Sequence, residues 1–136
     1  MDGFLRQLSD KLDPDEEMTI YLPPYSSLYW ASKSSHQFEI IFTLREKIAA
    51  WAAEYENIHL CDLQAESYVE SLDLYMDGSH ASVTIRKAAQ QAVITCTGEP
   101  TLQQIKERNQ TIKTYADNAL RKTNTYKYNN YSNGGK

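Results

Sequence analysis

The sequence predicts an α/β layered fold, and three observations support this prediction. Two short β-prone runs, Met18–Leu22 and Ile58–Leu63, are separated by a helical pattern from about His36 to Glu56. Strands separated by a helix of this length can be parallel neighbours joined by a right-handed crossover. The chain has 136 residues, of which 41% are hydrophobic and 24% charged, which is ordinary for one globular domain.

The first third of the chain has one helical segment, one strand and one irregular stretch. Met1–Leu12 has apolar residues at helical spacing rather than in a continuous run, so we expect a helix there and neither a signal peptide nor a membrane span. After the strand Met18–Leu22, Pro23 and Pro24 prevent further strand pairing. The stretch Tyr25–Ser35 has neither the helical nor the strand period, and we expect an irregular loop that borders a site.

The rest of the chain is predicted to be mainly helical. The helix from His36 to Glu56 has an apolar stripe formed by Ile41, Leu44, Ile48, Trp51, Ala52 and Tyr55. A short helix over Ala65–Leu74 and a helix over Val83–Val93 follow. A last amphipathic helix is marked by Leu102, Ile105, Asn109, Ile112, Ala116 and Ala119. We assign residues 1–121 to a single domain. Residues 122–136, which contain no acid, we assign to a flexible tail.

Composition argues against several classes of protein. Lys and Arg number 14 against 18 Asp and Glu, and the net charge of −4 argues against a nucleic-acid partner. The alternative is that the basic, tyrosine-rich tail stacks on sugars or single-stranded nucleic acid. The chain has two cysteines, Cys61 and Cys96, and three histidines, His36, His59 and His80. They form no metal-ligand cluster in the sequence, so we expect no metal and no cofactor. No window is long and apolar enough to cross a bilayer.

Asp77 and His80 are the residues that point to chemistry. A carboxylate and an imidazole three positions apart in a turn can lie side by side, and the carboxylate then fixes the tautomer of a catalytic base. Ser82 can cap the helix that follows, which would hold His80 at the mouth of the sheet. The same spacing also occurs in a surface turn that only caps a helix, so the residues alone leave both interpretations open.

The segment Tyr75-Met76-Asp77-Gly78-Ser79-His80-Ala81-Ser82, between a strand ending in Asp62 and a helix, resembles the C-terminal Asp-x-x-His block of the SGNH (GDSL-like) hydrolase superfamily. It is most similar to the bacterial cell-envelope branch, whose members move or remove O-acyl groups on polysaccharides. The resemblance covers about residues 1 to 95 and implies the C-terminal part of a three-layer α/β/α domain. It also implies that His80 is the general base, that Asp77 orients it, and that the protein acts in the cell envelope or periplasm.

The nucleophile block of that family is missing. There is no Gly-Asp-Ser, and none of the five glycines opens a strand-to-turn nucleophile block. A histidine base without a serine cannot perform acyl transfer by this mechanism, so we expect little or no esterase activity from the isolated chain. Ser26 and Ser27 follow the end of a predicted strand, where α/β proteins place a ligand crevice; their alternative role is capping and turn formation.

Two hypotheses follow for the function. The first is an acyl ester hydrolase or O-acetyltransferase module that acts on an acylated glycan, with Tyr25, Ser26 and Trp30 as substrate-binding residues. The second is a non-catalytic binding or protein-interaction module, in which the aromatic residues instead pack over the end of the core. Half of a doubly wound sheet exposes a strand edge, so we expect a homodimer or a complementing N-terminal half as partner.

Overall fold

The fold is mixed α/β, as the sequence predicts. The computed structural model describes the backbone of residues 2–96 and 100–132 and the side chains of residues 3–96 and 100–124. Its elements, in chain order, are α1 (Asp2–Ser9), β1 (Met18–Leu22), α2 (Ser27–Ala31), α3 (Ser35–Ala52), β2 (Ile58–Asp62), the 3-10 helices η1 (Ser67–Glu70) and η2 (Leu72–Leu74), α4 (Val83–Ile94) and α5 (Leu102–Ser132).

The two strands pair in parallel, which confirms the expected relation between them. The register runs from Met18 opposite Ile58 to Leu22 opposite Asp62. Beyond the strands, Met18 N donates to Asn57 O at 2.9 Å and Leu63 N donates to Leu22 O at 3.1 Å. In a parallel ladder, this pattern turns the backbone groups of alternate β1 residues, Met18, Ile20 and Leu22, toward β2.

The outer edge of β2 is covered by side chains. The carbonyl oxygen of Leu60 accepts a hydrogen bond from Cys96 Sγ at 3.9 Å, and that of Asp62 accepts one from Arg108 Nη1 at 2.7 Å. Cys96 follows α4 and Arg108 lies on α5. These contacts close the edge of the sheet that faces away from β1.

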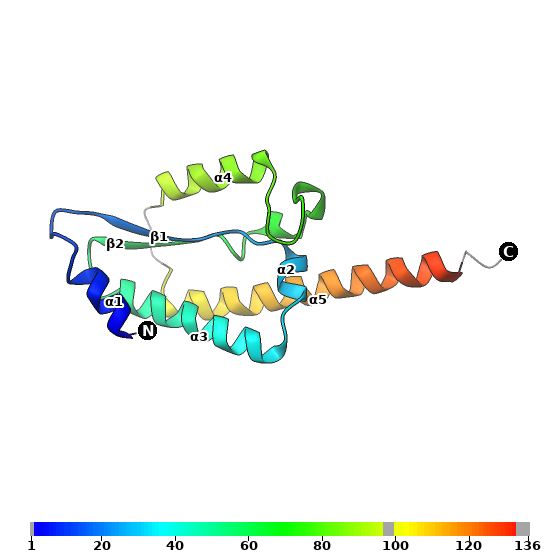
Figure 1. Cartoon of the computed structure of the whole chain (residues 1–136), viewed down its shortest axis with the longest axis horizontal. Coiled ribbons are helices and arrows are strands. Elements are labelled where there is room, and N and C mark those ends of the chain that lie inside the picture. Colours follow the sequence, from blue (N-terminus) through cyan, green and yellow to red (C-terminus); the bar gives the residue numbers. More distant parts are fainter. Residues whose placement is uncertain (1, 97–99, 133–136) are drawn as a thin grey trace.

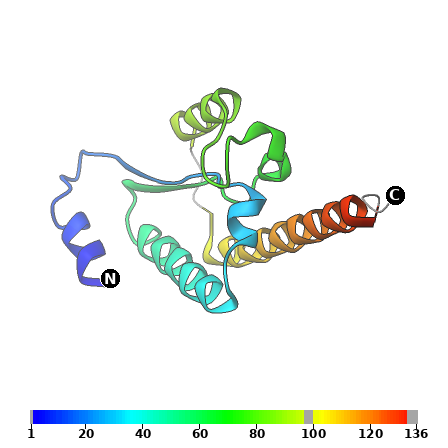
Figure 2. The same ribbon diagram turned by 45° about the vertical axis from the view of Figure 1, so that its right-hand side comes forward.

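Helices lie on both sides of the sheet (Figures 1 and 2). On one side, Ile58 and Leu60 share a buried cluster with residues of α1, α3 and α5: Leu5, Ala49, Trp51, Ala52 and Ile105. On the other side, Cys61 and Leu63 pack against Ala89 of α4. Strand β2 is therefore enclosed on both faces, as the continuous apolar character of Ile58–Leu63 predicts.

The predicted loop Tyr25–Ser35 contains a helix that the sequence pattern does not reveal. Ser26 caps α2 by accepting a hydrogen bond from Tyr29 N at 3.3 Å, and Trp30 is 1% exposed. A five-residue helix is too short to show a period, so burial of one aromatic ring decides its conformation. The predicted short helix over Ala65–Leu74 is likewise two 3-10 turns, η1 and η2.

Helix α5 continues well past the predicted start of the tail at residue 122. A reciprocal cap begins it: Gln104 N donates to Thr101 Oγ1 at 3.2 Å and Thr101 N donates to Gln104 Oε1 at 2.8 Å. From Leu102 to Ser132 the sequence has no glycine or proline to end the helix. The backbone of residues 122–132 is therefore helical and projects past the other elements (Figure 1), while residues 133–136 lie outside the described residues.

Candidate functional site

The Asp77–His80 turn is held in a closed loop between η2 and α4. Tyr75 and Ala81 form an antiparallel bridge around it. Met76 N donates to His80 O at 2.8 Å, and Ser82 N donates to Leu74 O at 2.8 Å. The side chain of Ser82 accepts a hydrogen bond from Ile85 N and caps α4, as predicted. The turn thus has a defined backbone on which two polar side chains are displayed.

Asp77 and His80 are hydrogen-bonded to each other, an arrangement that their spacing in the sequence allows. His80 Nδ1 lies 2.6 Å from Asp77 Oδ2. The other carboxylate oxygen, Oδ1, accepts hydrogen bonds from Ser79 N at 2.8 Å, His80 N at 2.9 Å and Ser79 Oγ at 3.2 Å. The backbone N–H of Ser79 and the side chain of His80 hold the pKa of Asp77 well below its ordinary value.

This geometry determines which nitrogen of His80 can act as a base. An ionised carboxylate only accepts hydrogen bonds, so Asp77 requires the proton of the neutral imidazole to lie on Nδ1. Nε2 is then the nitrogen with a free lone pair. The side chain of His80 is 73% exposed and that of Asp77 55% exposed, so a ligand can reach the pair.

Ser26 supports the turn from behind. It is completely buried, its hydroxyl donates to Gly78 O at 2.7 Å, and its N–H donates to the same oxygen at 3.2 Å. The hydroxyl of Tyr75 donates to Pro24 O at 2.9 Å, which links the same two segments again. These contacts join the end of β1 to the Asp77–His80 turn across about fifty residues of sequence.

A pocket of about 470 Å³ opens beside this pair. It is lined by Tyr21, Pro23, Pro24 and Tyr25 from the end of β1, by Met76, Asp77, Ser79, His80 and Ala81 from the turn, and by Ile85, Arg86 and Ala89 from α4. Apolar and aromatic side chains form most of the wall, with one carboxylate–imidazole pair and one guanidinium at its edge. Such a mixture is typical of a small-molecule site.

The predicted site residues have different environments. Tyr25 lines the pocket together with Asp77 and His80. Ser26 is not among the lining residues, since it lies buried behind the turn. Trp30 is also away from the pocket surface: it packs with Ile112 and Ala116 of α5 in a second buried cluster. Trp30 therefore packs over the core, as the alternative interpretation of the aromatic residues expects.

Tyr25, Tyr29 and Trp30 form a continuous aromatic group. The ring centroids of Tyr25 and Tyr29 are 4.3 Å apart and those of Tyr29 and Trp30 are 5.2 Å apart. Lys33 Nζ lies 4.0 Å from the centre of the Tyr29 ring. Trp30 thus anchors Tyr29 and Tyr25, and Tyr25 carries the aromatic surface out to the pocket.

Arg86 and Tyr21 belong to the pocket although sequence reasoning did not single them out. Arg86 lies in the first turn of α4, one turn after the Ser82 cap, and this position relative to the Asp-x-x-His segment is the signal that could have found it. Tyr21 alternates with half-buried residues along β1, so its side chain points to the side of the sheet where α4 lies.

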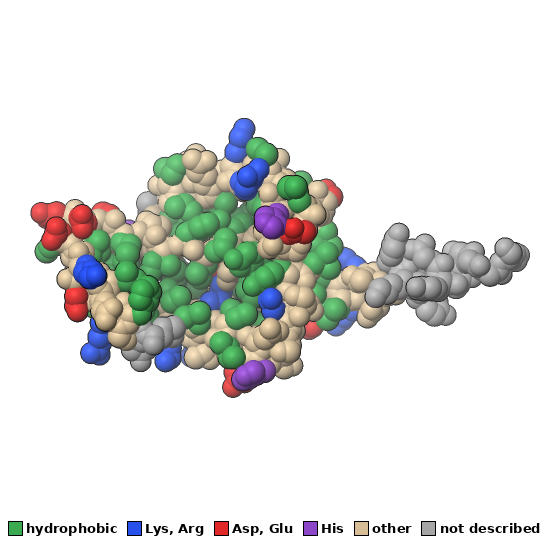
Figure 3. All heavy atoms as spheres, in the orientation of Figure 1, with side chains coloured by type: hydrophobic (Ala, Val, Ile, Leu, Met, Phe, Trp, Pro, Cys, Tyr) green, Lys and Arg blue, Asp and Glu red, His purple; other side chains and the backbone are tan. Residues whose placement is uncertain are grey.

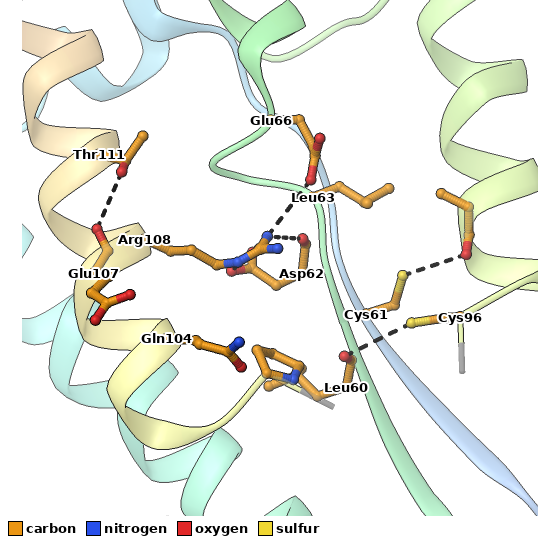
Figure 4. Close-up of a pocket in the computed structure, with 12 residues that line it drawn as sticks. Leu60, Cys61, Asp62, Leu63, Glu66, Cys96, Gln104, Glu107, Arg108 and Thr111 are labelled. Carbon is orange, nitrogen blue, oxygen red and sulfur yellow. Dashed lines mark hydrogen bonds and ion pairs between the residues drawn. The ribbon is translucent and has the colours of Figure 1, made fainter. Parts of the chain in front are cut away.

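A second pocket, of about 580 Å³, lies at the opposite edge of the sheet, between β2, α5 and the end of α4 (Figure 4). Arg108 of α5 points into it, and Nη1 lies 3.7 Å from both Asp62 Oδ2 and Glu66 Oε1. Cys61 and Cys96 line the other wall. Burial raises the pKa of the Cys61 thiol to about 12, so Cys61 provides no thiolate to this pocket.

A buried polar network separates the second pocket from the core. Arg45 of α3 donates to Asp62 through Nη1 and Nη2, at 3.2 and 2.7 Å, and through Nε to Asn109 Oδ1 at 2.6 Å. Nη1 also donates to Gln64 Oε1. All four side chains are almost completely buried. Asp62 lies at the end of a parallel strand, where an acid often binds a ligand. Here its carboxylate accepts hydrogen bonds from Arg45, so the role of Asp62 is structural.

Neither a metal-binding cluster nor a membrane-spanning helix occurs among the described residues. Over residues 3–96 and 100–124, no three His, Cys, Asp or Glu side chains are grouped so as to hold a metal ion. No helix in the same ranges is long and apolar enough to span a bilayer. The chain matches no protein-family model, no curated protein and no solved structure.

Proposed function

We propose that this chain supplies the base half of an acyl-transfer site and is the C-terminal part of a three-layer α/β/α, SGNH-type domain. Its substrate is an acylated polysaccharide of the bacterial cell envelope, on which the complete site acts as an ester hydrolase or O-acetyltransferase. The observation that carries the proposal is the Asp77–His80 pair, joined at 2.6 Å and open to a pocket beside the end of β1. The residue pattern of this segment supports the same assignment.

In this proposal His80 moves the protons of the reaction. Nε2 takes the proton of a hydroxyl nucleophile as its oxygen forms a bond to the ester carbon, and the ionised Asp77 stabilises the imidazolium. When the carbon–oxygen bond of the leaving alcohol breaks, His80 returns the proton to that oxygen. General base catalysis of this kind contributes about 10²- to 10⁴-fold to the rate.

The nucleophile comes from outside this chain. Ser79, the serine among the described lining residues, uses its hydroxyl to donate to Asp77 at 3.2 Å. Ser26 donates to Gly78 O and is completely buried. The apolar wall formed by Pro23, Pro24 and Tyr25 suits an acyl group and the apolar face of a sugar ring.

An activated aryl acetate tests the proposal because it can acylate a histidine directly without a serine. We expect slow release of the phenol that depends on His80 Nε2. His80→Ala abolishes this release, and Asp77→Asn lowers it by about tenfold or more because the tautomer is no longer fixed. His36→Ala is the matched control, since His36 is 79% exposed and lies 3.8 Å from Glu39 across one helical turn.

Two results would contradict the proposal. Equal rates for the wild-type chain and His80→Ala would show that the pair does not activate the imidazole. Strong turnover of an unactivated acetyl ester by the isolated chain, lost in His80→Ala, would show that one of its own serines is the nucleophile. In that case the base assignment would stand and the external nucleophile would be wrong.

The second candidate function is a non-catalytic module that binds a glycan or a protein, and the commitment of Ser26 and Ser79 to structural hydrogen bonds favours it. Titration of the isotopically labelled chain with an O-acetylated oligosaccharide and with its deacetylated form separates the two functions. A catalytic module shifts the amide signals around His80 only with the acetylated form. A binding module shifts those of Tyr25 with both forms, and binding survives His80→Ala but not Tyr25→Ala.

A further inference from the structure

One edge of the two-stranded sheet is open. The ladder turns Met18, Ile20 and Leu22 toward β2, so the N–H and C=O groups of Thr19 and Tyr21 point away from it. Within the part of the chain that the structure describes, these groups have no backbone partner. The next outward position is Pro23, which has no N–H. The open edge therefore presents two residues, and such an edge is a template for another strand.

The surface around this edge is apolar. Figure 3 shows hydrophobic side chains gathered over the middle of the face, below α4 and above α3, where β1 crosses in Figure 1. Half-buried residues from α1, from the segment after it and from β1 contribute to the adjoining cluster, among them Leu8, Leu12, Ile20 and Leu22. Tyr21 is 39% exposed and Leu44 of α3 is 37% exposed. An occupant that pairs with β1 would remove this surface from water.

The two ends of the open edge carry opposite charges. Before β1, the segment 13–17 contains four acids, Asp13, Asp15, Glu16 and Glu17, and Asn57 Nδ2 fixes it by donating to Glu16 O at 2.8 Å. After β1 there are two cations, Arg86 in the pocket with Pro23 and Pro24 and Lys33 over the Tyr29 ring. One carboxylate, Asp77, lines the same pocket and is hydrogen-bonded to His80. An antiparallel neighbour with the same charges would bring acid to base at both ends, whereas a parallel one would bring like charges together.

We propose that the occupant of this edge is a second copy of the chain, with its β1 antiparallel to the first across a two-fold axis at Ile20. Thr19 of each copy then faces Tyr21 of the other, and each of these pairs exchanges both N–H···O hydrogen bonds. The same surface is used on both copies, as a two-fold interface requires. The proposal depends on the sheet edge and the charges and does not rest on the proposed function. It is an alternative to completion of the sheet by a separate N-terminal half, because the strands of that half would occupy the same edge of β1.

This arrangement also completes the pocket beside His80. With Thr19 opposite Tyr21, the same register places Glu17 opposite Pro23 of the second copy, and the turn that precedes Glu17 then lies toward the Pro23–Tyr25 end of that copy. The acidic segment of one copy therefore borders the pocket of the other on the side of Arg86. Each dimer has two such pockets, each with walls from both copies.

The experiment is a measurement of mass against concentration by sedimentation equilibrium on the full chain. We expect a monomer–dimer equilibrium that is weakened by salt, because charged groups meet at both ends of the interface. Hydrogen exchange supplies the local readout: the Tyr21 amide is protected where the dimer is populated and exchanges freely on dilution. A monomer at all concentrations, including one that pairs only with a separate strand-bearing protein, overturns the proposal.

Three variants test the geometry. Thr19→Pro removes an outward N–H but no hydrogen bond to β2, and we expect the dimer to weaken about 30-fold because two symmetric donors are lost. Asp15→Lys and Arg86→Glu each weaken it roughly tenfold, and the double variant recovers affinity because the charges are exchanged. Lys87→Glu is the matched control, since Lys87 is exposed on α4 and does not line the pocket.

Circular dichroism and urea unfolding confirm that each variant is folded. If Thr19→Pro proves unfolded, the charge-exchange pair decides the question alone. A dimer that is unaffected by Thr19→Pro in a folded chain overturns the proposal. If the double variant loses as much affinity for its second copy as the single variants do, the antiparallel register is wrong.

Discussion

Replacement of Arg45 by methionine should destabilise the protein more than any change at the surface. The Arg45 side chain is 2% exposed and its partner Asp62 is 0% exposed, so the variant leaves a carboxylate buried without its main counterion. The acceptor oxygens of Gln64 and Asn109 also lose a charged donor. Methionine fills a similar volume, and the loss is therefore electrostatic rather than a cavity.

The expected loss follows from these contacts. Breaking a buried ion pair by removal of one partner costs about 3–5 kcal/mol. Two groups remain to compensate Asp62: Gln64 N donates to Oδ1 at 3.1 Å, and Arg108 lies 3.7 Å from Oδ2. We therefore expect a loss of about 4 kcal/mol in the free energy of unfolding, which is a large part of the 5–15 kcal/mol typical of a domain.

Urea unfolding followed by tryptophan fluorescence measures this loss. With a slope of about 2 kcal/mol per molar urea, the midpoint should fall by about 2 M. The double variant Arg45→Met with Asp62→Leu should lose less than the sum of the single variants, because a buried pair can be replaced by apolar groups at little cost. His36→Ala, at an exposed pair, should change the midpoint little. A loss below about 1 kcal/mol for Arg45→Met would refute the assignment of Asp62 as a buried carboxylate that depends on Arg45 as its main counterion.

Three further predictions concern single residues. The pKa of Asp77 is lowered, chiefly by the N–H of Ser79 and by His80. Its contribution to stability is therefore present above the ordinary pKa of an aspartate and is lost as the pH falls through the lower, folded-state value. Carboxyl-carbon NMR should show Asp77 still ionised below the pH at which a free aspartate is protonated, and protonation of Asp77 in the ordinary range would contradict this. Burial raises the pKa of Cys61 to about 12, so this thiol should resist alkylation at pH 8 in the folded chain and react in urea. Mass spectrometry measures the labelling. Equal labelling in both states would show that the thiol is accessible. Ser26→Ala removes both the α2 cap and the hydrogen bond to Gly78, so we expect the free energy of unfolding in urea to fall by about 2 kcal/mol. Ser32→Ala is the control: its hydroxyl is exposed, and the free energy of unfolding should fall much less.

The elements with a clear period could be predicted from the sequence. Strand β1 has its expected bounds, and β2, α3 and α4 begin and end within four residues of theirs, because alternation and helical stripes reflect the burial that actually occurs. The end of α3 at Ala52 instead of Glu56 shows the limit of this signal, since Tyr55 packs against the core without being helical. Helix α2 was missed because five residues contain no period.

The candidate site was predictable only where its residues are neighbours in sequence. Asp77 and His80 are three positions apart, and a turn suffices to bring them together. The contact of Ser26 with Gly78 joins residues 52 positions apart and depends on the packing of the whole chain. The Arg45–Asp62 pair combines α3 with the end of β2, and a lone arginine on a helical face gives no sign of the acid that it will meet.

The coverage of the β2 edge limits how far the sheet can grow. Cys96 and Arg108 occupy the outward carbonyl oxygens of Leu60 and Asp62, so a further strand can add only beside β1. In two copies joined through β1, the outward edges of the joined sheet would be the covered β2 edges. A third copy of the chain would then find no open strand edge to pair with. Association through this sheet therefore ends at a closed pair and does not propagate into a fibre. Removal of the Arg108 cap would be the change that exposes the chain to open-ended aggregation.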